Sequence, residues 1–366
     1  MPQSSKPESS SGLHRTVGRG AVSNPVNRFE AIHMEDDFEH FSDADDSPLR
    51  PKLPTTYLND QSETIVSENK SPDLGFRFSL NPYRGCSHGC SYCYARPSHE
   101  YLGFNTGLDF ESKIMVKQNS AALLKKWLAR KNWQPEPIML SGVTDPYQTA
   151  ERIFKVTRQC LQVAWEARQP MQLITKNALI CRDIDLLQMM AAENLVNVTI
   201  SITSLDQRLI KLMEPRTSSS KARFTAIRQL ADAGIPVNIN TAPIIPGLND
   251  SEIPALLETA KEHGATSASY ILLRLPYSVK EVFLDWVDEF FPEKRSVIES
   301  RIRATSKDHL NRNQFGKRMT GEGIYADQIR QAFRLFKAKF GLDQKLSELR
   351  RDLFRRPNLG RQMELF

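Results

Sequence analysis

Apolar positions follow two different periods between Gly75 and Leu273. Short apolar runs predict strands at 76–80, 137–141, 171–175, 196–202, 237–240 and 269–273. Between them, apolar residues recur every three or four positions, which predicts amphipathic helices at 118–131, 151–168, 184–193, 221–233 and 252–263. Regular alternation of strands and helices is typical of a parallel sheet covered by helices.

The number of these β/α units limits the architecture. Six units are fewer than the eight that close a barrel. They predict an α/β fold, an open partial (β/α)6 TIM-like barrel, over residues 71–278. In such folds the C-terminal ends of the strands carry the chemistry.

The segments on either side of this core differ from it. Residues 1–70 are rich in Ser, Pro, Asn and charge with little periodicity, which predicts a largely disordered N-terminal arm. Amphipathic patterns at 279–291 and 326–340 predict a helical C-terminal extension over 279–344. Residues 345–366 form a basic tail with five arginines.

Composition narrows the class of protein. The chain has 366 residues, and no apolar run approaches the roughly 20 residues of a membrane helix. Its first residues lack the apolar stretch of a signal peptide. Five cysteines, three of them clustered, argue against a disulfide scaffold and favour the reducing cytoplasm. The net charge of +6 suits a polyanionic partner without requiring one.

Three cysteines lie close together directly after the first predicted strand. Cys86, Cys90 and Cys93 have the spacing C-x3-C-x2-C. Three thiolates on one loop can bind three irons of a [4Fe–4S] cluster, which leaves one iron open for chemistry. The alternative is a Cys3His zinc site completed by His88 or His99, although no second ligand pair follows in the sequence.

This spacing, with Tyr92 and Tyr94 on either side of the third cysteine, resembles the signature of the radical S-adenosylmethionine (SAM) superfamily. The resemblance implies a [4Fe–4S] cluster and SAM as cofactors, with SAM on the open iron. It implies that the reduced cluster cleaves SAM to a 5′-deoxyadenosyl radical, with electrons from a low-potential donor such as flavodoxin or ferredoxin. Tyr92 and Tyr94 are then expected among the cofactor-binding residues.

Polar residues end successive predicted strands, where SAM is expected to bind. Thr144 and Asp145 offer acceptors for its ammonium group, and Lys176 offers a cation for its carboxylate. The remaining expected cofactor-binding residues are Ser141, Gly142, Ser201 and Pro246. Each polar residue alone could equally be a helix cap, so the set depends on its repetition at several strand ends.

A closer resemblance runs from about Ser71 to Gly341. It is carried by residues 81–97, 144–148, 182–183, 213–216 and 243–250, which resemble bacterial radical SAM proteins described as DNA repair photolyase-like, relatives of spore photoproduct lyase. The resemblance implies lyase-like action on damaged or modified nucleic acid. Because a fold does not define a substrate, two alternatives remain. One is a radical SAM enzyme for RNA, a peptide or a small molecule, and the other is a non-catalytic metal-site DNA-binding protein.

A lyase of this kind also requires a cysteine as hydrogen-atom donor. Cys160 lies within a predicted helix and is expected in the core. Cys181 follows the third strand and is the predicted donor. The predicted substrate contacts are His99, after the cysteine loop, and Arg274 and Tyr277, which end the sixth strand and suit a phosphate and a base.

The last five residues, from Gln362 to Phe366, resemble the peptide by which bacterial DNA polymerases and repair proteins bind the sliding clamp. A glutamine amide orients such a peptide and two apolar side chains anchor it. We therefore expect nucleic acid and the clamp as partners. The alternative is an amphipathic end that folds back on the core.

Overall fold

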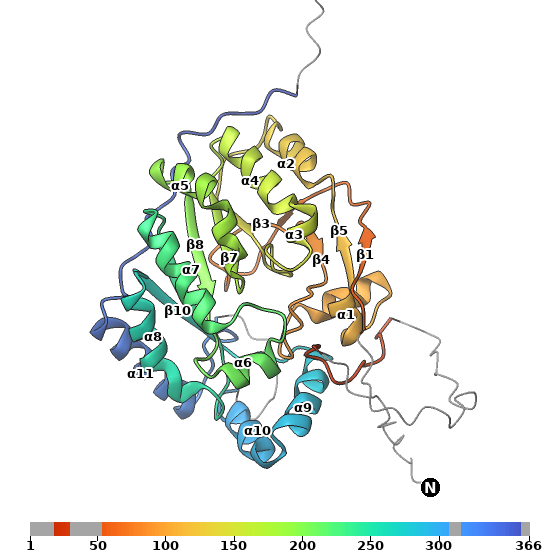
Figure 1. Cartoon of the computed structure of the whole chain (residues 1–366), viewed down its shortest axis with the longest axis vertical. Helices are drawn as coiled ribbons and strands as arrows, with labels where there is room; N and C mark the ends of the chain where they lie inside the picture. Colours follow the sequence, from red (N-terminus) through yellow and green to blue (C-terminus); the bar gives the residue numbers. More distant parts are fainter. Residues whose placement is uncertain (1–17, 30–52, 307–315, 360–366) are drawn as a thin grey trace, which may run out of the picture.

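The computed structural model describes residues 18–29, 53–306 and 316–359. Its main sheet has the strand order β10-β9-β8-β7-β6-β3-β2. The strands are β2 (Val66–Glu68), β3 (Phe78–Leu80), β6 (Ile138–Leu140), β7 (Met171–Thr175), β8 (Val196–Ser201), β9 (Val237–Ile244) and β10 (Ser267–Leu272). All six strands from β3 to β10 are parallel and follow one another in chain order, and β2 adds an antiparallel edge. The predicted open (β/α)6 arrangement is confirmed (Figure 1).

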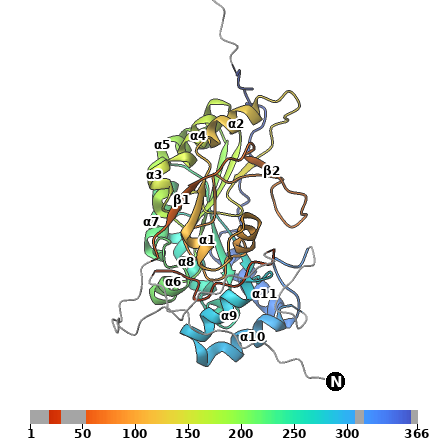
Figure 2. The same ribbon diagram turned by 90° about the vertical axis from the view of Figure 1, so that its right-hand side faces the viewer.

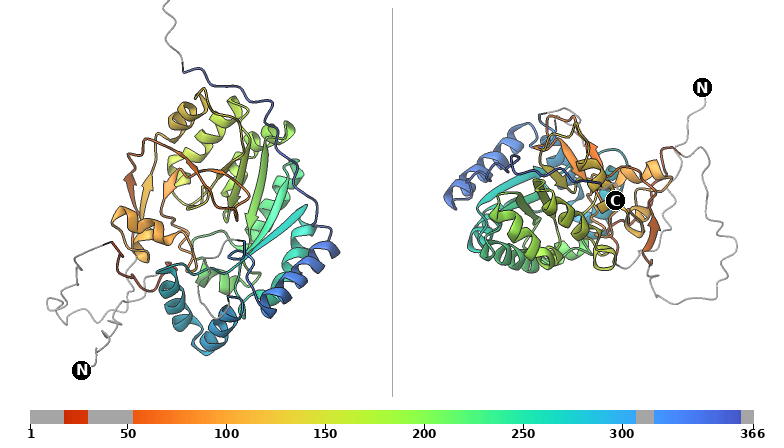
Figure 3. Two further views of the ribbon diagram at one scale, coloured as in Figure 1. Left: turned by 180° about the vertical axis from the view of Figure 1, so that it is seen from behind. Right: turned by 90° about the horizontal axis from the view of Figure 1, so that it is seen from above.

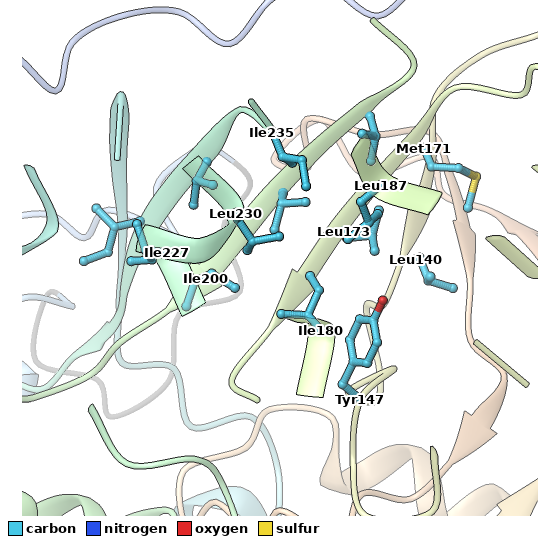
Figure 4. Packing of buried hydrophobic residues seen from close by; sticks show 14 of the residues in the cluster. Leu140, Tyr147, Met171, Leu173, Ile180, Leu187, Ile200, Ile227, Leu230 and Ile235 are labelled. Carbon is cyan, nitrogen blue, oxygen red and sulfur yellow. The ribbon is translucent and has the colours of Figure 1, made fainter. Parts of the chain in front are cut away.

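One face of the sheet is covered by helices and holds the main core. The connecting helices are α2 (Ser120–Leu128), α4 (Val156–Glu166), α5 (Ile184–Ala192), α7 (Ser220–Asp232) and α8 (Ile253–Glu262). Leu173 and Ile200 of the strands are buried against Leu187 of α5 and Leu230 of α7 (Figure 4). Each such side chain contributes about 1.5–3 kcal/mol when it leaves water, so this interface holds the helix layer on the sheet.

The other face of the sheet is polar. Alternate positions of the strands carry Gln172, Asn197, Thr199, Asn238, Asn240 and Ser269. Asn238 donates to Ser269 Oγ at 3.0 Å, and that hydroxyl donates to Asn240 Oδ1 at 3.2 Å. A closed barrel fills its interior with branched apolar side chains. Here the buried side chains of the inner face include Asn197, Asn238 and Asn240, whereas Thr199 and Ile271 are half-buried, so this face is polar and only partly covered.

One predicted helix is broken. The pattern at 151–168 predicts one helix, but the chain forms α3 (Glu151–Phe154) and then α4, separated by Lys155 in the left-handed region (φ 52°). The Glu151 carboxylate accepts the backbone N–H groups of Thr157 at 2.9 Å and Arg158 at 3.3 Å. These bonds satisfy free donors at the start of α4 and offset the unfavourable Lys155 conformation.

Within the predicted N-terminal arm, the structure describes residues 18–29 and 53–70, and these pack on the rest of the chain. Residues 53–70 supply β1 (Thr56–Asn59) and β2. Strand β1 belongs to a second sheet with the order β1-β5-β4, whose other strands are β5 (Lys113–Val116) and β4 (Tyr83–Arg84). Residues 18–29, here called the N-terminal strap, run between α1 (Leu108–Ser112) and α9 (Val279–Phe290) (Figure 1). The sequence shows no periodicity here because the strap is held mainly through backbone and polar contacts.

Beyond the barrel the chain is helical, as predicted, with α9, α10 (Arg295–Ala304) and α11 (Ile324–Lys339). Of these, α10 was not predicted. Helices α9 and α10 pack with α6 (Gln207–Met213) around Trp286, in a second core that also contains Cys90 and Tyr92. Figure 2 shows α9 and α10 at the same end of the molecule as α6. None of the helices in the described ranges has the length and apolar character needed to cross a membrane.

The described part of the basic tail crosses the N-terminal ends of the strands. Arg350 N–H donates to Asn194 O at 2.9 Å and Arg355 N–H donates to Ala167 O at 2.8 Å, just before β8 and β7 begin. Leu349 of this segment is buried. The view from behind shows the tail along that edge of the sheet (Figure 3). Residues 360–366, with the clamp-like peptide, lie outside the described residues.

Candidate active site

The three cysteines lie on the loop between β4 and the 3-10 helix η2 (Arg96–Leu102). Cys86 and Cys90 are buried, Cys93 is half-buried, and all three are free thiols. Ser91 N–H donates to Met213 O at 3.0 Å, which ties the loop to the segment after β8. The loop therefore lies at the C-terminal ends of the parallel strands, where the sequence analysis placed it.

The donor set fits a cluster better than a single zinc ion. In the described ranges, no three His, Cys, Asp or Glu side chains are grouped as they are around one metal ion. A [4Fe–4S] cluster binds each thiolate through a different iron, so its ligands need not meet at one point. His88, one proposed zinc ligand, is already engaged, because its Nδ1 lies 3.4 Å from Asp145 Oδ2 and its Nε2 lies 3.2 Å from Asn177 Nδ2.

The segment after β6 holds the loop on both sides of Cys86. Thr144 Oγ1 donates to Gly85 O at 2.7 Å, and Gln148 Nε2 donates to the same oxygen at 3.1 Å. Gln148 Oε1 accepts Ser87 N–H at 2.8 Å. Thr144, a predicted cofactor contact, thus supports the cysteine loop through its hydroxyl. The completely buried Gln148 was not among the predicted site residues, although residues 144–148 carry part of the family resemblance.

Asp145 joins two strand ends to the same loop. Its carboxylate accepts Thr175 Oγ1 at 2.7 Å and Lys176 N–H at 2.8 Å, and it faces His88. Burial by itself raises the pKa of Asp145, but the charge of His88 and these hydrogen bonds outweigh it and lower the pKa overall. Asp145 is therefore an anion at the C-terminal edge of the sheet, and its carboxylate oxygens already accept hydrogen bonds from the protein.

Lys176 and Glu214 form the centre of a buried polar network. Lys176 Nζ donates to Ala242 O at 2.8 Å, to Thr203 Oγ1 at 3.0 Å and to Glu214 Oε1 at 3.1 Å. Glu214 also accepts hydrogen bonds from Tyr92, Thr203 and Arg223.

The charge state of Glu214 follows from these partners. Burial favours a raised pKa, but the charges of Arg223 and Lys176 outweigh it and hold the pKa of Glu214 far below its usual value. Glu214 was not among the predicted site residues, although residues 213–216 carry part of the family resemblance.

Tyr94, Gly142 and Arg274 come together on the open side of the loop. Tyr94 OH donates to Gly142 O at 2.5 Å, and the Arg274 guanidinium lies 5.6 Å from the centroid of the Tyr94 ring. Ser141 and Gly142 have consecutive φ values of 142° and 132°, which turn the chain sharply after β6. The Tyr94 side chain keeps about half of its surface exposed, at 49%.

The other predicted contacts lie at the same edge. Ser201 is buried and its carbonyl accepts Arg223 Nη1 at 2.9 Å. Pro246 is buried in the turn between β9 and α8. Tyr277, just beyond β10, is exposed.

Two further predicted residues pack against apolar side chains. His99 is completely buried, bonds to Lys113 O at 3.0 Å through Nε2 and packs on Phe104 and Phe110, so its side chain has no exposed surface for a substrate. Cys181, in the 3-10 helix η3 (Ala178–Asp183), is half-buried and packs against the main core. Burial raises its pKa to about 11. Cys160 is completely buried in α4, as expected.

A buried ion pair that was not predicted from the sequence holds the far side of the loop. Arg96 Nη2 donates to Cys90 O at 2.8 Å and to Glu111 Oε1 at 2.5 Å, with both side chains completely buried. Glu111 accepts the N–H groups of Gly20 at 3.0 Å and Ala21 at 2.8 Å in the strap. Arg96 stands next to the cysteine motif, but no sequence pattern marks Glu111, because its partner lies 15 residues away.

His99 makes stability depend on pH. Burial lowers its pKa to about 4, below the unfolded value near 6.5. Between these values the unfolded chain takes up a proton that the folded chain does not, so the free energy of unfolding falls as pH falls, by on the order of 3 kcal/mol. We expect His99→Gln to flatten this dependence between pH 7 and pH 4.5 in urea titrations. An unchanged slope would mean that His99 titrates normally.

Replacing Glu214 is expected to lower the free energy of unfolding far more than replacing a surface acid with similar partners. Glu214→Gln leaves Arg223 and Lys176 buried without their anion, which we expect to lower the free energy of unfolding by about 3–5 kcal/mol. The control is Glu299→Gln, which also removes a carboxylate paired with two arginines but near the surface, where about 0–1 kcal/mol is expected. Equal losses in denaturant titrations would contradict the burial argument.

Comparison with known proteins agrees with this site. A family model described as the radical SAM superfamily matches residues 80–260. An uncharacterized protein of Mycobacterium tuberculosis is 36% identical over 230 residues, which cover 62% of this chain and 68% of that protein. An uncharacterized protein of Methanocaldococcus jannaschii is 28% identical over 250 residues, which cover 67% of this chain and 90% of that protein.

Solved structures show the same fold. A variant of spore photoproduct lyase superposes with a TM-score of 0.57 at 17% identity, over 78% of this chain and 79% of that one. Another variant, with bound SAM and dinucleoside spore photoproduct, gives a TM-score of 0.56 at 18% identity, over 78% of each chain. At this identity the likeness is one of fold. With the cysteine loop and the family match, it follows that the chain belongs to the radical SAM superfamily, whose members use a [4Fe–4S] cluster and SAM.

Proposed function

We propose that this radical SAM enzyme acts on damaged or modified nucleic acid in a lyase-like reaction, with Cys86, Cys90 and Cys93 as the cluster ligands. One observation carries the proposal. The cysteine loop is fixed from behind by buried polar residues, and its open side presents Tyr94 paired with Arg274. An aromatic ring next to a guanidinium suits a base and its phosphate.

When bound, the cluster and SAM supply one-electron cleavage of a C–S bond in SAM. The chain's own residues bind and orient the reactants. Lys176 remains the proposed contact for a carboxylate, and to bind one its Nζ must give up one of its hydrogen bonds to Ala242 O, Thr203 Oγ1 or Glu214 Oε1. Gly142, whose carbonyl accepts from Tyr94 OH, remains a proposed contact beside it. Thr144 and Asp145 act from behind, by holding the loop in place. Ser201 and Pro246 remain proposed contacts at the same edge.

The substrate class rests on chemistry at the rim. The chain carries a net charge of +6, and Arg274 and Tyr277 lie just past β10. One of the structurally similar lyase variants holds dinucleoside spore photoproduct. A low-potential electron donor completes the proposed set of partners. The clamp-like peptide at Gln362 to Phe366 stays a prediction.

Radical formation is expected to depend on the cysteine loop and to respond to nucleic acid. Protein reconstituted anaerobically with iron and sulfide, then given SAM and a strong reductant, should form 5′-deoxyadenosine, and Cys90→Ala should reduce this to background. Cys160→Ala, which changes a cysteine in the core, should retain it. Chromatographic quantification with irradiated DNA, intact DNA, RNA and no nucleic acid identifies the stimulating class.

Two results would overturn parts of this proposal. A protein with a fully loaded cluster that forms no 5′-deoxyadenosine would remove the enzymatic assignment. Product formation that is equal with and without every nucleic acid would leave a radical SAM enzyme for a different substrate class.

Cys181 remains the proposed hydrogen-atom donor and can be tested separately. If it donates, Cys181→Ala should leave 5′-deoxyadenosine formation intact but change the products made from a damaged dinucleotide, because the substrate radical is no longer quenched correctly. Mass spectrometry of the products provides the measurement. An unchanged product distribution would remove Cys181 from the reaction, in agreement with its packing against the main core.

A further inference from the structure

Four planar groups form a row where the N-terminal strap ends. The Phe29 ring lies 5.1 Å from the Tyr101 ring, between centroids. The Arg28 guanidinium lies 5.2 Å from the centroid of Phe29 and 4.2 Å from that of Tyr277. The order is therefore Tyr101, Phe29, Arg28, Tyr277, and we call these four residues the stacking row.

Buried polar contacts fix one side of the row, and the other side is exposed to solvent. Arg28 is bonded to Glu100, whose side chain is completely buried, and Asn27 donates to Glu100 O at 3.1 Å and to Phe104 O at 3.2 Å. The rings themselves face solvent, with exposed fractions of 75% for Tyr101, 59% for Phe29 and 64% for Tyr277. Large aromatic side chains left this exposed together are typical of a binding surface.

Two members of the row are close in sequence to residues of the candidate active site. Tyr101 lies on η2, which begins three residues after Cys93. Tyr277 lies three residues after Arg274, whose guanidinium faces Tyr94 beside the cysteine loop. Two members of the row therefore lie on the same chain segments as Cys93 and Arg274.

We propose that the stacking row binds unpaired nucleotides of a nucleic-acid strand and leads that strand to the active site. The inference rests on the proposed function and deepens it, because it names an unstacked, single-stranded segment as the form recognised. Bases stack on exposed aromatic rings whatever their sequence, at about 1–3 kcal/mol per base, and an arginine plane stacks in the same way.

The charges at the row favour this occupant over an acidic protein. Glu100 compensates the charge of Arg28, so the row offers little net charge to attract an acidic electron donor. Its exposed surface is made mainly of flat rings, which match bases. Binding is then expected to depend more on ring stacking than on salt.

The test is to measure the Kd of the reconstituted full chain for a labelled single-stranded oligothymidine and for its duplex. Fluorescence anisotropy under anaerobic conditions provides the measurement. We expect Phe29→Leu and Tyr277→Leu each to raise the Kd for the single strand about 5- to 150-fold, the equivalent of one lost stack. Tyr277→Phe keeps the ring and should bind normally. Ile324→Ala, which changes an exposed apolar residue on α11, serves as the control.

Each outcome separates this inference from the proposed function. If both leucine variants bind the single strand as tightly as wild type, the inference is wrong, even where nucleic acid stimulates 5′-deoxyadenosine formation. If they bind it normally but lose reduction by an acidic flavoprotein, the row is a donor-docking surface instead. If the wild type binds no oligonucleotide, both the inference and the nucleic-acid assignment fail. Preferential loss of single-strand binding supports the inference.

Discussion

The buried ion pair between Arg96 and Glu111 decides where the cysteine loop lies. Arg96 holds the carbonyl of Cys90, and Glu111 holds the backbone of the N-terminal strap at Gly20. A Cβ atom on Gly20 would lie 1.6 Å from Gly89 O, so the strap fits against the loop only because this position is glycine. An unpaired charge in such a place costs about 3–5 kcal/mol, so the two side chains, the loop and the strap are stable only together.

The same principle operates on the other side of the loop. Asp145 and Glu214 are buried anions whose partners come from different strand ends. Their hydrogen bonds hold the C-terminal edges of β6, β7 and β8 in one arrangement, with Lys176 among them. The polar residues at this edge of the sheet are thus held in place before any cofactor binds. Because the cofactor supplies the difficult chemistry, this preorganised binding site is the main contribution of the protein.

The fold of this chain does not by itself define its substrate. Its fold is similar to that of spore photoproduct lyase at 17% identity, and such a scaffold supports many reactions. The rim carries more specific chemistry, because the strap of residues 18–29 places Arg28 and Phe29 beside Tyr101 and Tyr277. The superfamily defines the chemistry, and the rim determines which substrate can approach it.

The sequence by itself determined the features that are local. Each β/α unit buries one apolar face within about 30 residues, so periodicity was enough to predict β7 at 171–175 and α5 from Ile184. Cys86, Cys90 and Cys93 lie on one loop, so their spacing is a local feature that the sequence shows directly.

Only the tertiary structure decided the rest. It showed the packing of the strap, the buried roles of Glu111 and Glu214, the break at Lys155 and the burial of His99. These depend on single polar contacts between residues far apart in the chain, and such contacts leave no period in the sequence because each is formed only once the fold brings its partners together.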